Sequence, residues 1–86
     1  MPRPRPSVID GLDVNEAEDG LIVFDPSVDR VHYLNSTAAI VFALCDGRHD
    51  VSEIADFVAA AFKLDDLPLA EIDACLSSLD NEGLLQ

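Results

Sequence analysis

The hydrophobic pattern changes period within residues 21–45. Residues 21–24 and 30–34 are apolar runs of strand length separated by polar turn formers, which predicts a β-hairpin. Asn35 is then a favourable helix N-cap, and apolar residues recur at helical spacing over residues 37–44. The sequence therefore predicts a strand that leads directly into a helix.

Similar signals predict the remaining elements. Residues 14–18 alternate in polarity and predict a first edge strand, and Asp50 with Glu53 resembles a capping box that opens a second helix. The inward face of this helix is expected to consist of residues at helical spacing: Val51, Ile54, Ala55, Val58 and Phe62. A third helix is expected to have Pro68 in its first turn and to stop at Gly83. We therefore predict an α+β, winged-helix-like fold, in which a three-stranded antiparallel sheet is followed by three helices.

The length of 86 residues suffices for one domain with one core. Residues 1–7 alternate proline with arginine and contain little to bury, so we expect a disordered Pro/Arg arm, with a single domain over residues 8–86. Cys45 and Cys75 lie inside apolar helical patterns without metal-site spacing, so we interpret both as small buried hydrophobic residues.

The charge balance is strongly acidic. The chain has seventeen acidic and five basic residues, which gives a net charge of −12. Arg3 and Arg5 lie in the N-terminal tail, so residues 7–86 have three basic and seventeen acidic residues and a net charge of −14. An anionic body repels phosphate groups, so neither nucleic acid nor a membrane surface is expected as a partner. The N-terminus has no apolar signal-peptide core and no apolar run is long enough to span a bilayer, so the expected location is the cytoplasm.

No catalytic or metal-binding pattern is present in the sequence. His32 and His49 are the only histidines, and neither has an acid, a nucleophile or a second histidine at a recognisable spacing. The four glycines are isolated in turns, so there is no phosphate-binding loop. We therefore expect a protein that is not an enzyme, with no metal and no cofactor.

The last predicted strand is the candidate functional element. If residues 31–34 form the edge of the sheet, an extended peptide can add to them by main-chain hydrogen bonds. One alternate pair, His32 with Leu34 or Val31 with Tyr33, would face the core and the other a partner. The third helix would form the second wall of a groove. The candidate peptide-binding residues are Val31, His32, Tyr33 and Leu34 on the strand and Ile72, Cys75, Leu76 and Leu79 on the helix.

Four segments of the chain resemble the PqqD family of peptide chaperones, which have the fold of the RiPP recognition element (RRE). They are VHYLNSTAA at 31–39, LCDG at 44–47, VSEI at 51–54 and LDNEGLL at 79–85. The resemblance covers residues 21–85, so residues 8–86 would form a single PqqD-like RRE domain. The acidity and the Pro/Arg arm are not signatures of this family.

The resemblance implies a non-catalytic protein that captures the leader segment of a ribosomally synthesised precursor peptide. The leader would add as a strand to residues 31–34, pack against the third helix, and be presented to a modifying enzyme such as a radical SAM protein.

Two other hypotheses use the same predicted elements. A winged-helix regulatory or DNA-binding module shares the helix count, but it needs a basic recognition helix, and residues 36–86 contain only Arg48 and Lys63. A homodimer could instead pair the edge strand with its symmetry mate and bind no leader. The sequence leaves open whether the protein is a monomer or a homodimer.

Overall fold

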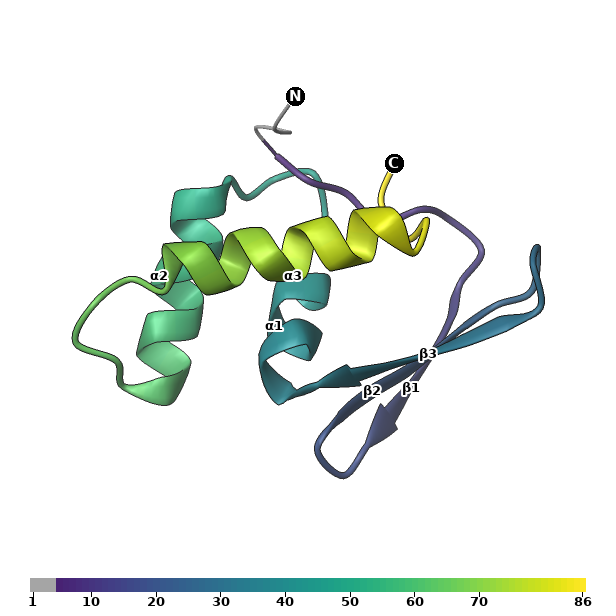
Figure 1. Ribbon diagram of the computed structural model, residues 1–86, viewed down its shortest axis with the longest axis horizontal. Coiled ribbons are helices and arrows are strands. Elements are labelled where there is room, and N and C mark those ends of the chain that lie inside the picture. Colours follow the sequence, from purple (N-terminus) through teal and green to yellow (C-terminus); the bar gives the residue numbers. More distant parts are fainter. Residues whose placement is uncertain (1–4) are drawn as a thin grey trace.

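The computed structural model describes residues 5–86 and shows three strands followed by three helices (Figure 1). In chain order the elements are β1 (Asp13–Ala17), β2 (Gly20–Asp25), β3 (Arg30–Asn35), α1 (Ser36–Leu44), α2 (Val51–Phe62) and α3 (Leu69–Asn81). The predicted α+β class and the order of elements are confirmed. The sheet and α3 lie on opposite sides of α1 in the view of Figure 1.

The sheet is an antiparallel meander with the order β1-β2-β3. In the turn that joins β2 to β3, the Asp25 carboxylate accepts hydrogen bonds from the backbone N–H of Ser27 at 3.0 Å and from its hydroxyl at 2.7 Å. This local bonding fixes a register in which Asp25 lies opposite Arg30 and Val23 opposite His32. Since side chains alternate between faces, the register turns Val23, His32 and Leu34 toward the helices.

Gly20 permits a close approach at the other end of the hairpin. It lies opposite Asn35, and a Cβ atom at this position would collide with the carbonyl group of Leu34. A residue without a side chain is therefore required where the β1–β2 turn passes the end of β3.

The helices begin largely where their capping residues predict. The Asn35 side chain accepts a hydrogen bond from the Ala38 N–H at 2.9 Å, and Asp50 and Glu53 form a reciprocal capping box. The expected start of α3 is wrong by one position, because Pro68 is the N-cap and the helix begins at the next residue. Phe62 does not belong to the inward face of α2, since it ends the helix with 41% of its surface exposed.

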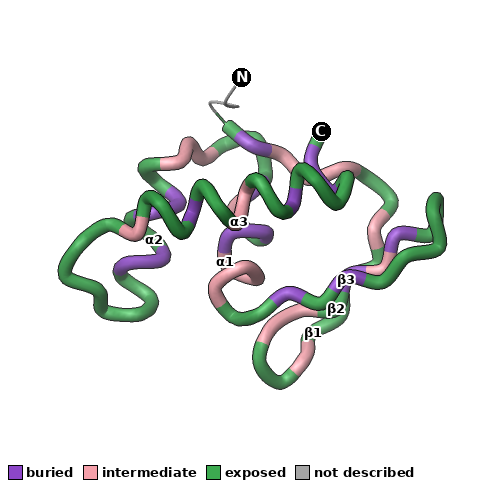
Figure 2. The backbone as a smooth tube through the Cα atoms, viewed as in Figure 1, coloured by how far each residue is buried: buried purple, intermediate pink, exposed green. Residues whose placement is uncertain are grey.

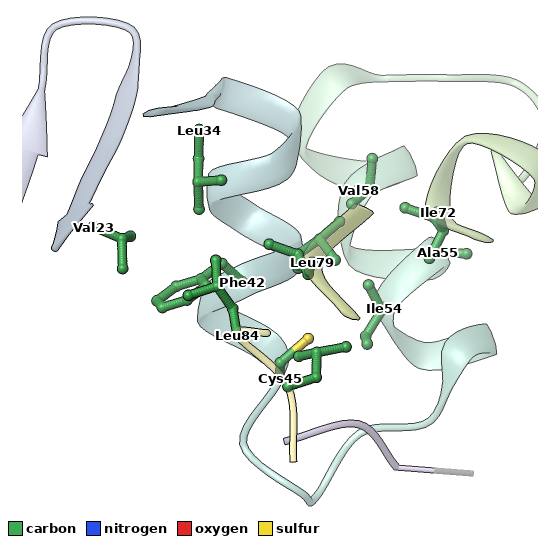
Figure 3. Packing of buried hydrophobic residues seen from close by; sticks show 12 residues of the cluster. Val23, Leu34, Phe42, Cys45, Ile54, Ala55, Val58, Ile72, Leu79 and Leu84 are labelled. Atoms are coloured by element: carbon green, nitrogen blue, oxygen red, sulfur yellow. The ribbon is translucent and has the colours of Figure 1, made fainter. Parts of the chain in front are cut away.

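One apolar core joins the sheet to all three helices. Its buried members are Val23, Leu34, Val41, Phe42, Cys45, Ile54, Ala55, Val58, Ile72, Leu79, Leu84 and Leu85. Figure 3 shows Phe42 lying between Val23 of the sheet and Leu84 of the C-terminal segment. α1 therefore packs directly against one face of a sheet that could not bury that face alone, and α2 and α3 pack against α1.

The two ends of the described chain pair with each other. Isolated bridges join Ser7 to Asp46 and Val8 to Leu85, and the Gly47 N–H donates to the Pro6 carbonyl at 3.0 Å. Pro6 is itself fully buried. The expected disordered arm over residues 1–7 is therefore wrong at Pro6 and Ser7, while its first four residues lie outside the described part of the chain.

Candidate functional site

A groove of about 350 Å³ lies between β3 and the C-terminal end of α3. It is lined by Arg30, Val31, His32, Tyr33 and Leu34 of β3, by Ser78, Leu79 and Glu82 at the end of α3, and by Leu84. α1 packs against both β2 and β3, whereas no Cα atom of α3 lies within 8 Å of a Cα atom of β3 over residues 5–86. The helix therefore stands back from the strand and leaves the groove between them.

β3 forms one wall of the groove and is an edge of the sheet. Within residues 5–86 it pairs only with β2, so its other row of backbone N–H and C=O groups has no strand partner. We call this side of β3 the open edge. An edge with unpaired backbone groups is a template for an additional strand.

Residues 31–35 of β3 alternate between exposed and buried positions. His32 and Leu34 each have 8% of their surface exposed, whereas Val31 is 65% and Tyr33 63% exposed. The sequence left open which pair faces the core, and the structure assigns that position to His32 and Leu34. An added strand would continue this alternation, with one set of side chains in the groove.

The end of α3 is shaped by a Schellman motif. The Leu84 N–H donates to the Leu79 carbonyl at 3.0 Å, the Gly83 N–H donates to the Asp80 carbonyl at 3.0 Å, and Gly83 has φ of +76°. The expected helix stop at Gly83 is confirmed. Because this turn reverses the chain, Leu84 enters the core and contributes to the groove wall, while Glu82 remains at the groove as the helix C-cap.

One end of the groove is charged. Glu82 Oε2 lies 3.7 Å from Arg30 Nη2 and 3.4 Å from His32 Nδ1. His32 Nε2 is buried and has no hydrogen-bond partner within residues 5–86. The three side chains link the start of β3 to the end of α3, so the groove is polar here and apolar beside Leu34, Leu79 and Leu84.

The structure places the predicted site residues in two groups. All four strand residues and Leu79 line the groove. Ile72 is fully buried in the core, and Cys75 and Leu76 are half-buried against that core, so these three helix residues are not among the groove-lining side chains.

Sequence reasoning missed four groove-lining residues: Arg30, Ser78, Glu82 and Leu84. Ser78 and Glu82 lie beside the apolar stripe of α3 rather than on it, so the apolar spacing gave no signal for them. Helical geometry nevertheless puts Cys75, Ser78 and Glu82 on one face, at spacings of three and four residues. That spacing could have identified them once the position of β3 was known.

The two cysteines differ in their surroundings. Burial, followed by the nearby charge of Asp46, raises the pKa of the Cys45 thiol to about 11. Burial, followed by the charge of Glu71, raises the pKa of Cys75, which is less enclosed. Both thiols are therefore poor nucleophiles near neutral pH, since the thiolate is the reactive form.

Residues 5–86 contain no group of three or more His, Cys, Asp or Glu side chains that could hold a metal ion. No helix in the same range combines the length and apolar character needed to cross a membrane.

The fold and the groove define a small α+β domain of winged-helix type whose edge strand faces its last helix. The model of the family described as "Coenzyme PQQ synthesis protein D (PqqD)" matches residues 20–85. The chain belongs to this family, as its sequence motifs predicted. None of the curated protein sequences compared with it gives a significant match.

Two solved structures share the fold. One is TbiB1 in complex with the TbiA(beta) leader peptide, with a TM-score of 0.79, 18% sequence identity, and coverage of 93% of this chain and 94% of that one. The other is the solution structure of the PqqD truncation of Methylobacterium extorquens PqqCD, described as a functional, stand-alone RiPP recognition element. It has a TM-score of 0.68 and 26% identity, with coverage of 94% of this chain and 87% of that one.

Proposed function

We propose that this protein binds the leader segment of a ribosomally synthesised precursor peptide by adding it as a strand to the open edge of β3. Main-chain hydrogen bonds along residues 31–34 would supply much of the affinity, and the groove would select the leader side chains that point into it. The protein would then present the bound peptide to a modifying enzyme without taking part in the chemistry. Radical SAM enzymes are one class that fits this role.

The observation that carries the proposal is the open edge facing a groove. β3 has unpaired backbone groups, α3 stands back from it, and three leucines, Leu34, Leu79 and Leu84, line the apolar part of the space between them. Membership of the PqqD family, and the shared fold of TbiB1, whose structure contains a leader peptide, support a leader peptide as the ligand. A strand inserted here would satisfy the backbone groups and contact the apolar wall.

The experiment is titration calorimetry of the full chain against the leader of a precursor peptide encoded beside its gene, with the core segment of that precursor as the control. We expect the leader to bind with a dissociation constant of about 10 μM or tighter, roughly −7 kcal/mol, and the core segment not to bind. The titration is repeated with the neighbouring modifying enzyme present. Failure of the leader to bind in both titrations would contradict the proposal.

Self-association is the competing use of the same edge. Two copies could pair their β3 strands about a two-fold axis and so occupy the site. Sedimentation of the chain with and without leader separates the two: leader capture predicts a complex with one peptide per chain. A dimer that persists at saturating peptide would favour self-pairing.

A further inference from the structure

The outward face of the sheet carries an apolar strip next to the open edge. In the register of the sheet, Phe24 lies opposite Val31 and Ile22 lies opposite Tyr33. These four side chains share the face that points away from the helices, because they alternate with the inward-facing Val23 and His32. We call Ile22, Phe24, Val31 and Tyr33 the outer strip.

The strip is more exposed on β3 than on β2. Ile22 is 37% exposed and Phe24 is half-buried, whereas Val31 and Tyr33 are 65% and 63% exposed. β2 has a neighbouring strand on each side, while within residues 5–86 β3 has one on a single side. Val31 and Tyr33 are therefore more exposed because no neighbouring strand covers them on the open side of β3.

We propose that the peptide added at the open edge also covers the outer strip, so that the domain recognises a leader segment with apolar side chains on both faces. The inference rests on the proposed function and specifies its substrate: a run of about four consecutive residues that are β-branched, aromatic or otherwise apolar. If the groove alone selected the leader, only the leader side chains that point into the groove would have to be apolar, which is every second residue.

The geometry of strand pairing explains why a peptide added at the open edge would cover the outer strip. Side chains of neighbouring strands that share a face lie about 4.5–5.5 Å apart at Cβ, so every second residue of an added strand comes to lie beside Val31 or Tyr33. This holds whether the peptide runs parallel or antiparallel to β3. A polar or charged leader residue there would cover apolar surface without gaining an apolar contact.

The residue choice on β3 supports the same conclusion. Natural edge strands are protected by charged residues that oppose pairing, and Lys or Glu would be tolerated at positions as exposed as those of Val31 and Tyr33. A valine and a tyrosine are instead favourable strand-pairing residues. The outward face of β3 is therefore suited to a neighbour that brings its own apolar side chains.

The test begins with a library of random dodecapeptides displayed and selected on the immobilised full chain. Enriched peptides are synthesised, and their dissociation constants are measured with the wild-type chain and with the edge variants His32→Pro and Tyr33→Pro. We expect enriched sequences to contain a run of about four apolar residues, and the proline variant that retains the fold to weaken their binding about 100-fold.

The second part tests the outer strip itself. Val31→Thr and Tyr33→Thr keep residues that favour strands but remove apolar surface, and we expect each to weaken peptide binding about threefold and the double variant about tenfold. The matched control is Val28→Thr in the β2–β3 turn, which removes a valine that is 57% exposed but not on the strand. It should leave the affinity unchanged. Urea unfolding of each variant verifies that the fold is retained.

The outcomes separate the inference from the proposed function. Peptides that require the open edge but show alternate apolar positions, and bind both threonine variants as tightly as wild type, would overturn the inference alone. Failure to enrich any peptide, or peptides insensitive to both proline variants, would overturn the proposed function and the inference together. A loss of self-association in the threonine variants without any change in peptide affinity would assign the strip to a second copy of the chain, and would also overturn the inference.

Discussion

β1 and β3 are the two edges of one sheet, and they expose different chemistry. β1 exposes Asp13, Asn15 and Glu16 and one large apolar residue, Val14, at 46%, and over residues 5–86 no helix packs against it (Figure 2). β3 exposes Val31 and Tyr33, contacts α1, and has the groove along its inward face. β1 therefore exposes mostly polar and charged side chains, whereas β3 beyond Arg30 exposes two large apolar side chains.

The difference indicates which edge is protected from pairing. Charged side chains along an exposed strand oppose the approach of another strand, and β1 has this protection. β3 carries a charged side chain only at its first residue, Arg30, and it is also the edge from which the end of α3 stands back to leave the groove. The variants below either remove this difference between the edges or measure it.

Proline substitution at the two edges should give the largest effect. Successive N–H groups of a strand point to opposite sides, so one of His32 and Tyr33 directs its N–H to β2 and the other to the open edge. We expect the variant at the open edge to weaken leader binding about 100-fold, roughly 2.7 kcal/mol, and to retain the fold. The variant that faces β2 should unfold the hairpin.

The matched control is Asn15→Pro on β1, assessed by calorimetry and circular dichroism. If β1 plays no part in binding, any folded fraction of this variant should bind leader as tightly as wild type. Unchanged affinity in both β3 variants, with their folds intact, would contradict strand addition at β3.

Gly20→Ala should have the second largest effect. The new methyl group would collide with the Leu34 carbonyl, so the end of β3 must shift, and we expect a loss of about 2 kcal/mol in the free energy of unfolding together with weaker leader binding. The control Asn15→Ala should change the free energy of unfolding by less than about 0.5 kcal/mol. Urea unfolding measures both, and equal stability of the two variants would show that the close approach is relaxed at no cost.

Local patterns predicted the strand half of the site well. The alternation along residues 31–34 narrowed the inward-facing set to two choices, and the Asn35 and Asp50 caps placed the starts of α1 and α2. These features depend on residues close together in the chain. Propensity and capping are therefore sufficient for them.

Packing between distant segments decided what the sequence could not predict. The apolar stripe of α3 showed that one side is inward, but not that Ile72 would be fully buried while Leu79 would also line the groove. Pro6 was expected in a disordered arm, yet its carbonyl accepts from Gly47 because the chain ends pair beside the α1–α2 connection. Such contacts depend on where the C-terminal segment returns to the core.

The smallest expected effect concerns the cysteines and tests whether the groove extends along α3. At pH 8 a pKa of about 11 leaves about one Cys45 thiol in a thousand ionised, so Cys75 should react faster with iodoacetamide. Both alkylation rates should rise with pH, because a raised pKa shifts thiolate formation to higher pH.

Bound leader should slow the alkylation of Cys75, which shares a helix face with Ser78 and Glu82, by about two- to threefold and leave the alkylation of Cys45 unchanged. Mass spectrometry of the alkylated chain measures both rates, and equal protection of the two thiols would indicate a global effect.

Amide hydrogen exchange by NMR, with and without leader, tests strand addition at β3 most directly. An added strand must accept hydrogen bonds from the N–H groups of the open edge, so we predict slower exchange at alternate residues of β3 on leader binding and no change along β1. Leader binding that leaves the exchange of every β3 amide unchanged, or that protects β1 instead, would contradict the account.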